Sequence, residues 1–255
     1  MQSTQNKQRE LEMFDVRRES EFELLGDSFY KLAGDRLEKH APQVVTGGQR
    51  VLEAGCGTGA FGRHFIKALE GRAAWNVTGV DLAPAMVEWN REHPLPGYDS
   101  LAGDLEDESL FATETFDVVL CPMVLHHFPN PAKVMRNLAA WLKPGGIFYI
   151  IEPNGSSPVN RFFKFGRHCV EKIMGLEYAK RFATVNETDH AMGRYLRELG
   201  AAGCEAVHRE TRFVKTAADF DTPIHAARRI MQTAASVLPM PLRGNLLLVV
   251  ARKKS

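Results

Sequence analysis

Short apolar runs alternate with segments of helical periodicity along the first part of the chain. RVLEAG at 50–55 is a short apolar run closed by glycines, and WNVTGVDL at 75–82 repeats this pattern of a run and a turn. FDVVLCP at 116–122 is a continuous apolar run. A weaker run follows at 98–102, and IFYIIEP occupies 147–153. Strands buried on both faces of a parallel sheet have this pattern, so the chain is expected to contain five parallel strands.

Helices are predicted between these strands, over residues 60–70, 84–93 and 131–142. Pro84 suits a first helical turn, and the glycine and proline clusters at 94–97 and 143–146 should end the second and third helices. Further helices are expected within 8–40, at 187–199 and at 224–238, and late strands at 204–213 and 245–254. The whole is a doubly wound, Rossmann-like α/β fold with a mostly parallel seven-stranded sheet and helices on both faces.

The composition of the chain argues against several classes of function. The chain has 255 residues, 44% of them hydrophobic and 25% charged, with a formal net charge of +1, so no general attraction to nucleic acid is expected. The four cysteines lack metal-ligand spacing, which argues against a metal site and favours a reducing cytoplasm. A polar N-terminus and the absence of a long apolar stretch predict no transmembrane segment, and leave peripheral membrane contact open.

The glycine-rich segment 53–59, Glu-Ala-Gly-Cys-Gly-Thr-Gly, is the first candidate site. Gly57, Gly59 and Gly62 match the dinucleotide fingerprint G-x-G-x-x-G, which keeps an NAD(P)-dependent oxidoreductase as an alternative. However, the strand ends at 54, so the turn is made by Gly55-x-Gly57-x-Gly59, with Glu53 just before it. Amides bared by glycine at a helix N-terminus suit the carboxylate of an amino acid as well as a phosphate.

Two acidic residues follow the next strands. Asp81 lies where a carboxylate accepts hydrogen bonds from both hydroxyls of an adenosine ribose, a position that a dehydrogenase would also use. Asp104, after the third strand, could accept from an adenine amino group. The simpler interpretations are a plain tight turn for the glycines and helix capping for Asp81 and Asp104.

In order, the segments E-A-G-C-G-T-G, V-D-L-A-P-A-M, A-G-D-L, F-D-V-V-L-C-P-M-V-L-H-H-F and L-K-P-G-G-I cover roughly residues 50–152. Together they resemble class I S-adenosylmethionine-dependent methyltransferases of the small-molecule, ubiquinone-biosynthesis-like branch. The resemblance implies S-adenosylmethionine as cofactor and a glycine loop around its methionyl group, with Asp81 on the ribose. The implied cofactor-binding residues are Glu53, Gly55, Cys56, Gly57, Gly59, Asp81, Leu82, Met86, Asp104, Leu105 and Cys121, the last facing the sulfonium.

The implied reaction is in-line transfer of a methyl group to oxygen, nitrogen or carbon of a small molecule. A hydroxyl or acidic carbon also requires a base, for which His126 and His127 after the fourth strand are candidates, although they could merely shape the loop. His190 is a second candidate, and Glu152 could bind substrate or its own loop. The other alternative to a methyltransferase is a module that binds S-adenosylmethionine without catalysis and acts through a partner.

The expected organisation is an N-terminal helical segment (1–42) covering the cofactor site and a methyltransferase domain (43–255), with a helical lid insertion at 153–185. Aromatic and basic residues interleave in this lid, among them Arg161, Phe162, Lys164 and Phe165. They could form an apolar lid with a cationic rim for an anionic or amphiphilic acceptor, or touch a membrane. The favoured interpretation is simpler, with phenylalanines packed on the sheet and basic groups in solvent. No nucleic-acid partner is expected, since CPMV replaces the N-P-P-Y type of motif.

Overall fold

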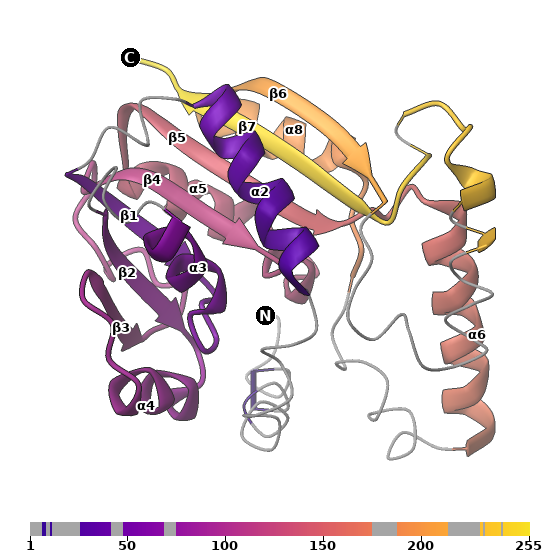
Figure 1. Ribbon diagram of the computed structural model, residues 1–255, viewed down its shortest axis with the longest axis horizontal. Helices are drawn as coiled ribbons and strands as arrows, with labels where there is room; N and C mark the ends of the chain where they lie inside the picture. The colour runs from indigo at the N-terminus through magenta and orange to yellow at the C-terminus, as the bar shows by residue number, and fades with distance from the viewer. Residues whose placement is uncertain are drawn as a thin grey trace.

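A computed structural model describes residues 7–8, 11, 26–41, 48–68, 75–174, 188–213, 230–231, 233–240 and 242–255. Seven strands form one sheet in the order β3-β2-β1-β4-β5-β7-β6 (Figure 1). The strands are β1 (Gln49–Ala54), β2 (Trp75–Asp81), β3 (Tyr98–Ala102), β4 (Phe116–Pro122), β5 (Leu142–Pro153), β6 (Cys204–Arg212) and β7 (Leu246–Lys253). The helices are α2 (Gly26–His40), α3 (Ala60–Ala68), α4 (Pro84–Glu92), η2 (Leu125–His127), α5 (Ala132–Trp141), α6 (Pro158–Met174) and α8 (Met192–Ala201).

The sheet is parallel except at β7, which runs antiparallel to both β5 and β6. This confirms the predicted mostly parallel, seven-stranded, doubly wound fold. The strand order reverses between β1 and β4, which are paired in parallel. In such sheets the connections leave in opposite directions at the reversal and open a crevice at the carboxyl ends of the strands, where ligands bind.

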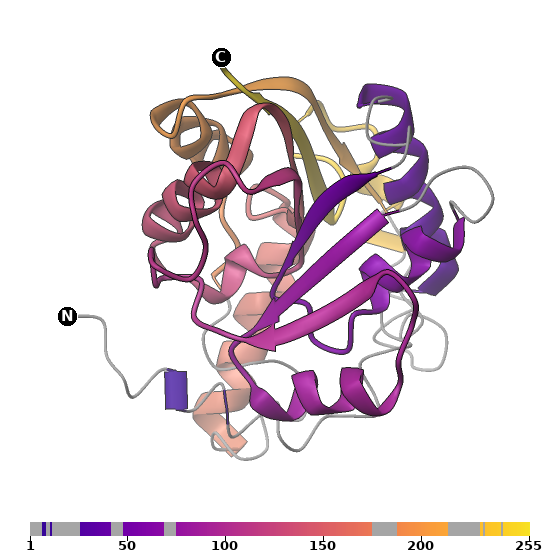
Figure 2. The ribbon, with the colours of Figure 1, turned by 90° about the vertical axis from the view of Figure 1, so that its left-hand side faces the viewer.

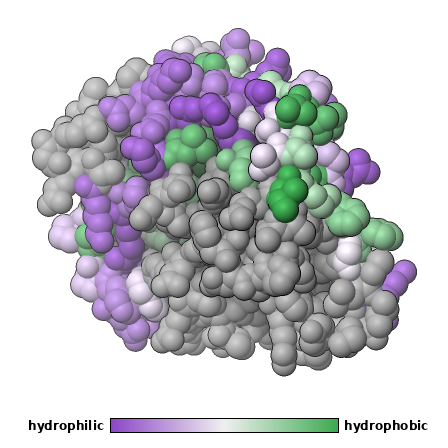
Figure 3. Space-filling view, turned by 45° about the vertical axis from the view of Figure 1, so that its right-hand side comes forward, coloured by the Kyte–Doolittle hydropathy of each residue, from purple (hydrophilic) through white to green (hydrophobic). Residues whose placement is uncertain are grey.

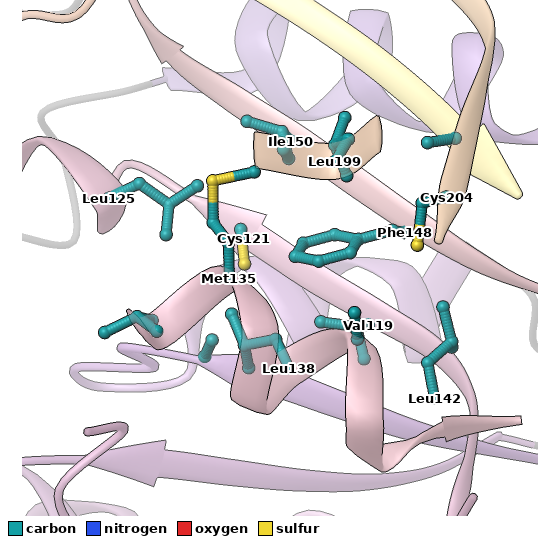
Figure 4. Packing of buried hydrophobic residues seen from close by; sticks show 14 of the residues in the cluster. Val119, Cys121, Leu125, Met135, Leu138, Leu142, Phe148, Ile150, Leu199 and Cys204 are labelled. Carbon is teal, nitrogen blue, oxygen red and sulfur yellow. The ribbon is translucent and has the colours of Figure 1, made fainter. Parts of the chain in front are cut away.

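Two apolar layers hold the helices to the sheet. Figure 4 shows one of them, where Met135 and Leu138 of α5 pack against Val119 and Phe148 of the sheet, with Leu199 of α8 beside them. The other layer contains α2 and α3, which contribute Phe29, Ala33, Leu37, Phe61 and Phe65. Figure 2 shows α2 and α5 on opposite sides of the sheet.

Helix α2 is an integral part of this core. The hydroxyl of Tyr149 donates a 2.6 Å hydrogen bond to the carbonyl of Ala33, and Arg36 forms an ion pair with Glu210 of β6. Helix α2 of the N-terminal segment therefore packs on the sheet. Lys7, farther upstream, forms ion pairs with Asp104 and Glu106. The proposed segment boundary at residue 42 and a cover over the cofactor site remain predictions.

Two details of the sequence-based prediction are wrong. The cluster 143–146 does not separate a helix from a later strand, because β5 begins at Leu142 and runs through it. A Cβ on Gly146 would lie 2.9 Å from the carbonyl oxygen of Asp117, so glycine lets the strand approach β4 there. The helix expected from residue 187 begins only at Met192, since hydrogen bonds from Thr188 to the His126 carbonyl and from Gly155 to the His190 carbonyl hold residues 188–190 as a connecting segment.

The expected lid contains helix α6, and its residues 175–185 lie outside the described part of the chain. Its Phe162 and Phe165 are 59% and 68% exposed, so the interpretation that these phenylalanines pack on the sheet is wrong. None of the helices that the structure describes is long and apolar enough to cross a membrane.

The end of α2 docks on β6 through two histidines. The rings of His40 and His208 are stacked with centroids 3.6 Å apart and an interplanar angle of 8°. Burial lowers the pKa of His40, and the neighbouring His208, Lys39 and Arg36 lower it further, against the opposing effect of Glu210. The folded state therefore favours the neutral imidazole.

We expect this contact to weaken in acid. A histidine whose folded pKa lies below its ordinary value of 6.5 stabilises the fold fully above that pH and loses its contribution as the pH falls below it. Thermal unfolding measured across this range should show a steeper acid loss for the natural chain than for His40→Phe, which keeps a stacking ring but does not titrate. Equal pH profiles for the two proteins would contradict this role.

Candidate active site

The carboxyl ends of β1, β2, β4 and β5 bring the predicted site residues to one edge of the sheet. The glycine turn after β1 has the expected geometry, with φ values of +60° at Gly55 and +49° at Gly57. A Cβ on Gly55 would lie 2.2 Å from Val124 Cγ2, so the turn after β4 packs directly on this loop. At Gly57 nothing lies within 4 Å of the same position. The loop is thus supported at Gly55 and open at Gly57.

The backbone N–H and the backbone carbonyl of Gly57 are both hydrogen-bonded to side chains. Its N–H donates to Asp81 Oδ2 at 2.8 Å, and its carbonyl accepts from Asn90 Nδ2 at 2.8 Å. The other oxygen of Asp81 accepts from the N–H of Ala83 at 2.9 Å. Asp81 therefore fixes the glycine loop relative to the turn after β2, in addition to any ligand that it binds. Asn90 was not predicted, although it is a buried polar residue four positions after Met86 on α4.

Glu53 is turned beneath the loop. It is 1% exposed and accepts hydrogen bonds from the Tyr98 hydroxyl at 2.8 Å and the Gly62 N–H at 3.1 Å. Burial raises the pKa of Glu53 to about 7, although both hydrogen bonds oppose this shift. Tyr98 itself comes within 2.5 Å of where a Cβ on Gly59 would be. These contacts give Glu53 and Tyr98 a role in supporting the loop from below.

Replacing Tyr98 with phenylalanine should leave a buried carboxylate oxygen of Glu53 without its donor. We expect a loss of about 1–3 kcal/mol in the free energy of unfolding, measured by denaturant titration. The matched control is Tyr195→Phe, since the buried Tyr195 hydroxyl has no hydrogen-bond partner within the described part of the chain. That variant should lose little or no stability, and an equal loss in both would contradict the assigned role of the Tyr98 hydroxyl.

The remaining predicted cofactor residues differ in their surroundings. Leu82 is partly exposed beside Asp81, whereas Met86, Leu105, Cys56 and Cys121 are buried. Asp104 Oδ2 lies 2.5 Å from Lys7 Nζ, and its Oδ1 accepts from the Glu106 N–H. Cys121 is fully buried between the sheet and α5 (Figure 4), and this burial raises the pKa of its thiol well above the ordinary value. Its position favours a packing role.

Glu152, at the end of β5, organises the turn after β4. Its carboxylate is fully buried and accepts hydrogen bonds from the backbone N–H groups of Val124 at 2.8 Å, Leu125 at 2.6 Å and His126 at 3.3 Å. His126 Nδ1 lies 2.7 Å from Glu152 Oε2. The turn also contains Met123, whose φ of +57° is unusual for a residue other than glycine and marks local backbone strain.

All three predicted histidines gather around this turn. The rings of His126 and His127 have centroids 4.2 Å apart, and His126 is buried. His190 Nε2 lies 2.9 Å from the carbonyl oxygen of Phe128, and burial lowers the pKa of His190 despite that hydrogen bond. The segment before α8 thus returns to the β4 turn, which brings His190 near His126 from a distant part of the chain.

The structure thus brings three features to the carboxyl ends of the central strands. These are the loop of glycines after β1, the carboxylate of Asp81 after β2 and the histidine–carboxylate pair across β4 and β5. The chain belongs to the methyltransferase domain family, whose profile matches residues 18–216. It therefore belongs to the class that the sequence motifs predicted.

Named relatives agree with this family. The chain is 30% identical to the ubiquinone biosynthesis O-methyltransferase of Xanthomonas campestris pv. campestris strain B100 over 157 residues, which is 60% of this chain and 64% of the relative. It is 34% identical to the protein of the same name from Xanthomonas oryzae pv. oryzae strain PXO99A over 152 residues, 58% of this chain and 62% of the relative. The match thus spans less than two thirds of these relatives.

Solved structures share the fold. A chain from the complex between the Haloferax volcanii Trm112 methyltransferase activator and a putative methyltransferase superposes with a TM-score of 0.62 at 20% identity, covering 95% of this chain and 98% of that one. An S-adenosylmethionine-dependent methyltransferase from Mesorhizobium loti gives 0.58 at 22% identity, covering 88% of this chain and 100% of that one.

Proposed function

We propose that this methyltransferase domain transfers the methyl group of S-adenosylmethionine to a small-molecule acceptor. The observation that carries the proposal is the open backbone at Gly57 placed directly against the carboxylate of Asp81. A backbone that a side chain would otherwise cover leaves room for a ligand, and the adjacent carboxylate suits ribose hydroxyls. Family membership favours this activity over an oxidoreductase or a silent binding module.

The residues of the site divide the binding of S-adenosylmethionine among them. Gly55, Gly57 and Gly59 would hold the methionyl group, Asp81 the ribose and Leu82 the neighbouring apolar surface. Asp104 and Leu105 would border the adenine, with Lys7 already paired to Asp104. When bound, S-adenosylmethionine supplies an electrophilic methyl carbon, so the protein must mainly align the acceptor and exclude water.

A general base is available at the β4 turn. With His126 Nδ1 donating to Glu152, the basic lone pair lies on Nε2, and the buried carboxylate stabilises the imidazolium that forms when a proton is taken. His126 is therefore the first candidate for deprotonating a hydroxyl acceptor. His190 is the second, and its lowered pKa keeps it neutral and able to accept a proton at neutral pH.

The acceptor that fits best is an amphiphilic molecule with a hydroxyl group. The relatives are named for O-methylation in ubiquinone biosynthesis, and the lid helix α6 presents exposed phenylalanines next to basic residues. We place the reaction in the cytoplasm, because the described cysteines Cys56, Cys121 and Cys204 are free thiols, which suits a reducing compartment.

Calorimetric titration with S-adenosylmethionine, S-adenosylhomocysteine and NADH tests the cofactor assignment. The first two should bind and NADH should not. Asp81→Ala should weaken S-adenosylmethionine binding by about 1–3 kcal/mol, because the ribose hydroxyls lose their acceptor. Asp99→Ala, which removes an exposed carboxylate on the neighbouring strand β3, is the control. Binding of NADH alone, or unchanged affinity in Asp81→Ala, would contradict the proposal.

His126→Asn tests the base. An asparagine amide can replace His126 Nδ1 as a donor to Glu152, so the buried carboxylate keeps a partner while the basic nitrogen is lost. With a hydroxyl acceptor we expect kcat to fall by a factor of about 10²–10⁴, with little change in S-adenosylmethionine affinity or thermal stability. A normal kcat in this variant, or a fall that only matches a loss of stability, would assign His126 a structural role.

A further inference from the structure

Two buried asparagines fasten the start of α6 to the segment before β7. Asn154 Nδ2 donates to the carbonyl oxygens of Arg243 at 3.1 Å and Gly244 at 3.3 Å. Asn160 Nδ2, on the first turn of α6, donates to the carbonyl oxygens of Asn154 at 3.2 Å and Asn245 at 2.8 Å. Both side chains are buried. Hydrogen bonds at this depth make the two segments one rigid unit.

This unit presents large apolar side chains to solvent. Phe162 and Phe165 project from α6, and the segment leading to β7 exposes Ile230, Val237, Met240 and Leu242 by 69%, 86%, 38% and 41%. Figure 1 places this segment beside the first turns of α6, and Figure 3, which brings this side forward, shows apolar side chains gathered at its upper right. We call these six residues the apolar platform. Exposed apolar surface of this kind usually marks an interaction site.

The two segments of the sequence that carry the platform are rich in basic residues. Residues 155–181 contain six lysines and arginines against two acidic residues, and residues 222–244 contain three arginines and no acidic residue. Because the whole chain has a net charge of only +1, the rest of it is net acidic. Arg161 and Arg243, which adjoin Phe162 and Leu242 in the sequence, are exposed, and so is Lys172 in the last turn of α6. The exposed basic residues that the structure describes here therefore lie on the same two segments as the exposed apolar side chains.

The platform adjoins the acceptor side of the proposed active site. Helix α6 follows the end of β5, where Glu152 binds the β4 turn. The N–H of Gly155 donates to the carbonyl oxygen of His190 at 3.2 Å, and a Cβ on Gly155 would lie 2.3 Å from the carbonyl oxygen of Asp189. The base of the platform is thus packed against the segment that carries His190.

We propose that the apolar platform docks this protein on a bilayer surface that contains anionic phospholipid, and that the amphiphilic acceptor reaches the site from that surface. Phenylalanines enter the boundary between headgroups and acyl chains, while Arg161, Lys172 and Arg243 face lipid phosphates. A second copy of the chain fits less well, because a two-fold interface through this face would bring the same basic residues together. Access of the acceptor rests on the proposed function, whereas docking does not.

Vesicle flotation tests docking directly. The purified chain is mixed with phosphatidylcholine vesicles, with or without phosphatidylglycerol, and we expect it to float with the anionic vesicles and to be released by high salt. Phe162→Ser with Phe165→Ser should reduce this partitioning at least about tenfold, because burial of one phenylalanine side chain already exceeds the free energy of a tenfold change. Arg161→Gln with Lys172→Gln should reduce it for anionic vesicles only.

Val207→Ser is the matched control, because Val207 is 47% exposed on β6 and lies outside the platform. It should float as the natural chain does. Each variant is also checked for thermal unfolding and for S-adenosylmethionine binding, which the platform substitutions should leave unchanged. If a variant binds S-adenosylmethionine but does not float, docking has failed while the cofactor site of the proposed function is intact.

Three results would overturn the proposal. The first is that the natural chain does not float with anionic vesicles. The second is that Val207→Ser loses as much flotation as the double phenylalanine variant. The third is a dimer in light scattering that the double phenylalanine variant dissociates without any vesicle binding, which would make the platform a subunit interface. If docking holds, an acceptor with a long alkyl chain presented in anionic vesicles should show a higher KM with the double variant, while a short-chain soluble analogue should not.

Discussion

The carboxylate of Glu152 is the contact on which the arrangement of the site depends. A carboxylate without solvent must be matched by donors, and the turn after β4 supplies three backbone N–H groups and the His126 ring. Val124 of the same turn lies against Gly55. One buried carboxyl group therefore connects β5 to the β4 turn, and this turn packs on the glycine loop. Met123, in the same turn, has the strained backbone.

The two sides of the candidate site are built from different parts of the chain. Asp81, Asn90 and Tyr98, from β2, α4 and β3, hold the glycine loop. Glu152 and the connection before α8 hold the turn after β4, where we propose that the acceptor binds. Because few groups are shared between these two sides, the acceptor side can change while the cofactor side stays intact.

Much of the sheet was predictable because buried parallel strands carry their own signal in continuous apolar runs. The glycine turn was predictable for a similar reason, since its residue types are dictated locally. The support of Glu53 by Tyr98 was not, because it joins positions 45 residues apart and depends on how β3 pairs. The exposure of Phe162 was missed because helical periodicity identifies an apolar face without showing what covers it.

The place of β7 in the sheet bears on how the chain is made. This strand follows β6 in the sequence but lies between β5 and β6, antiparallel to both. During synthesis, one edge of β5 therefore stays unpaired until residues 246–253 leave the ribosome. Until then β6 has no neighbouring strand to pair with. An open apolar edge invites pairing with another nascent chain. Between translation of β5 and translation of β7, the free edge of β5 is thus where such pairing would begin.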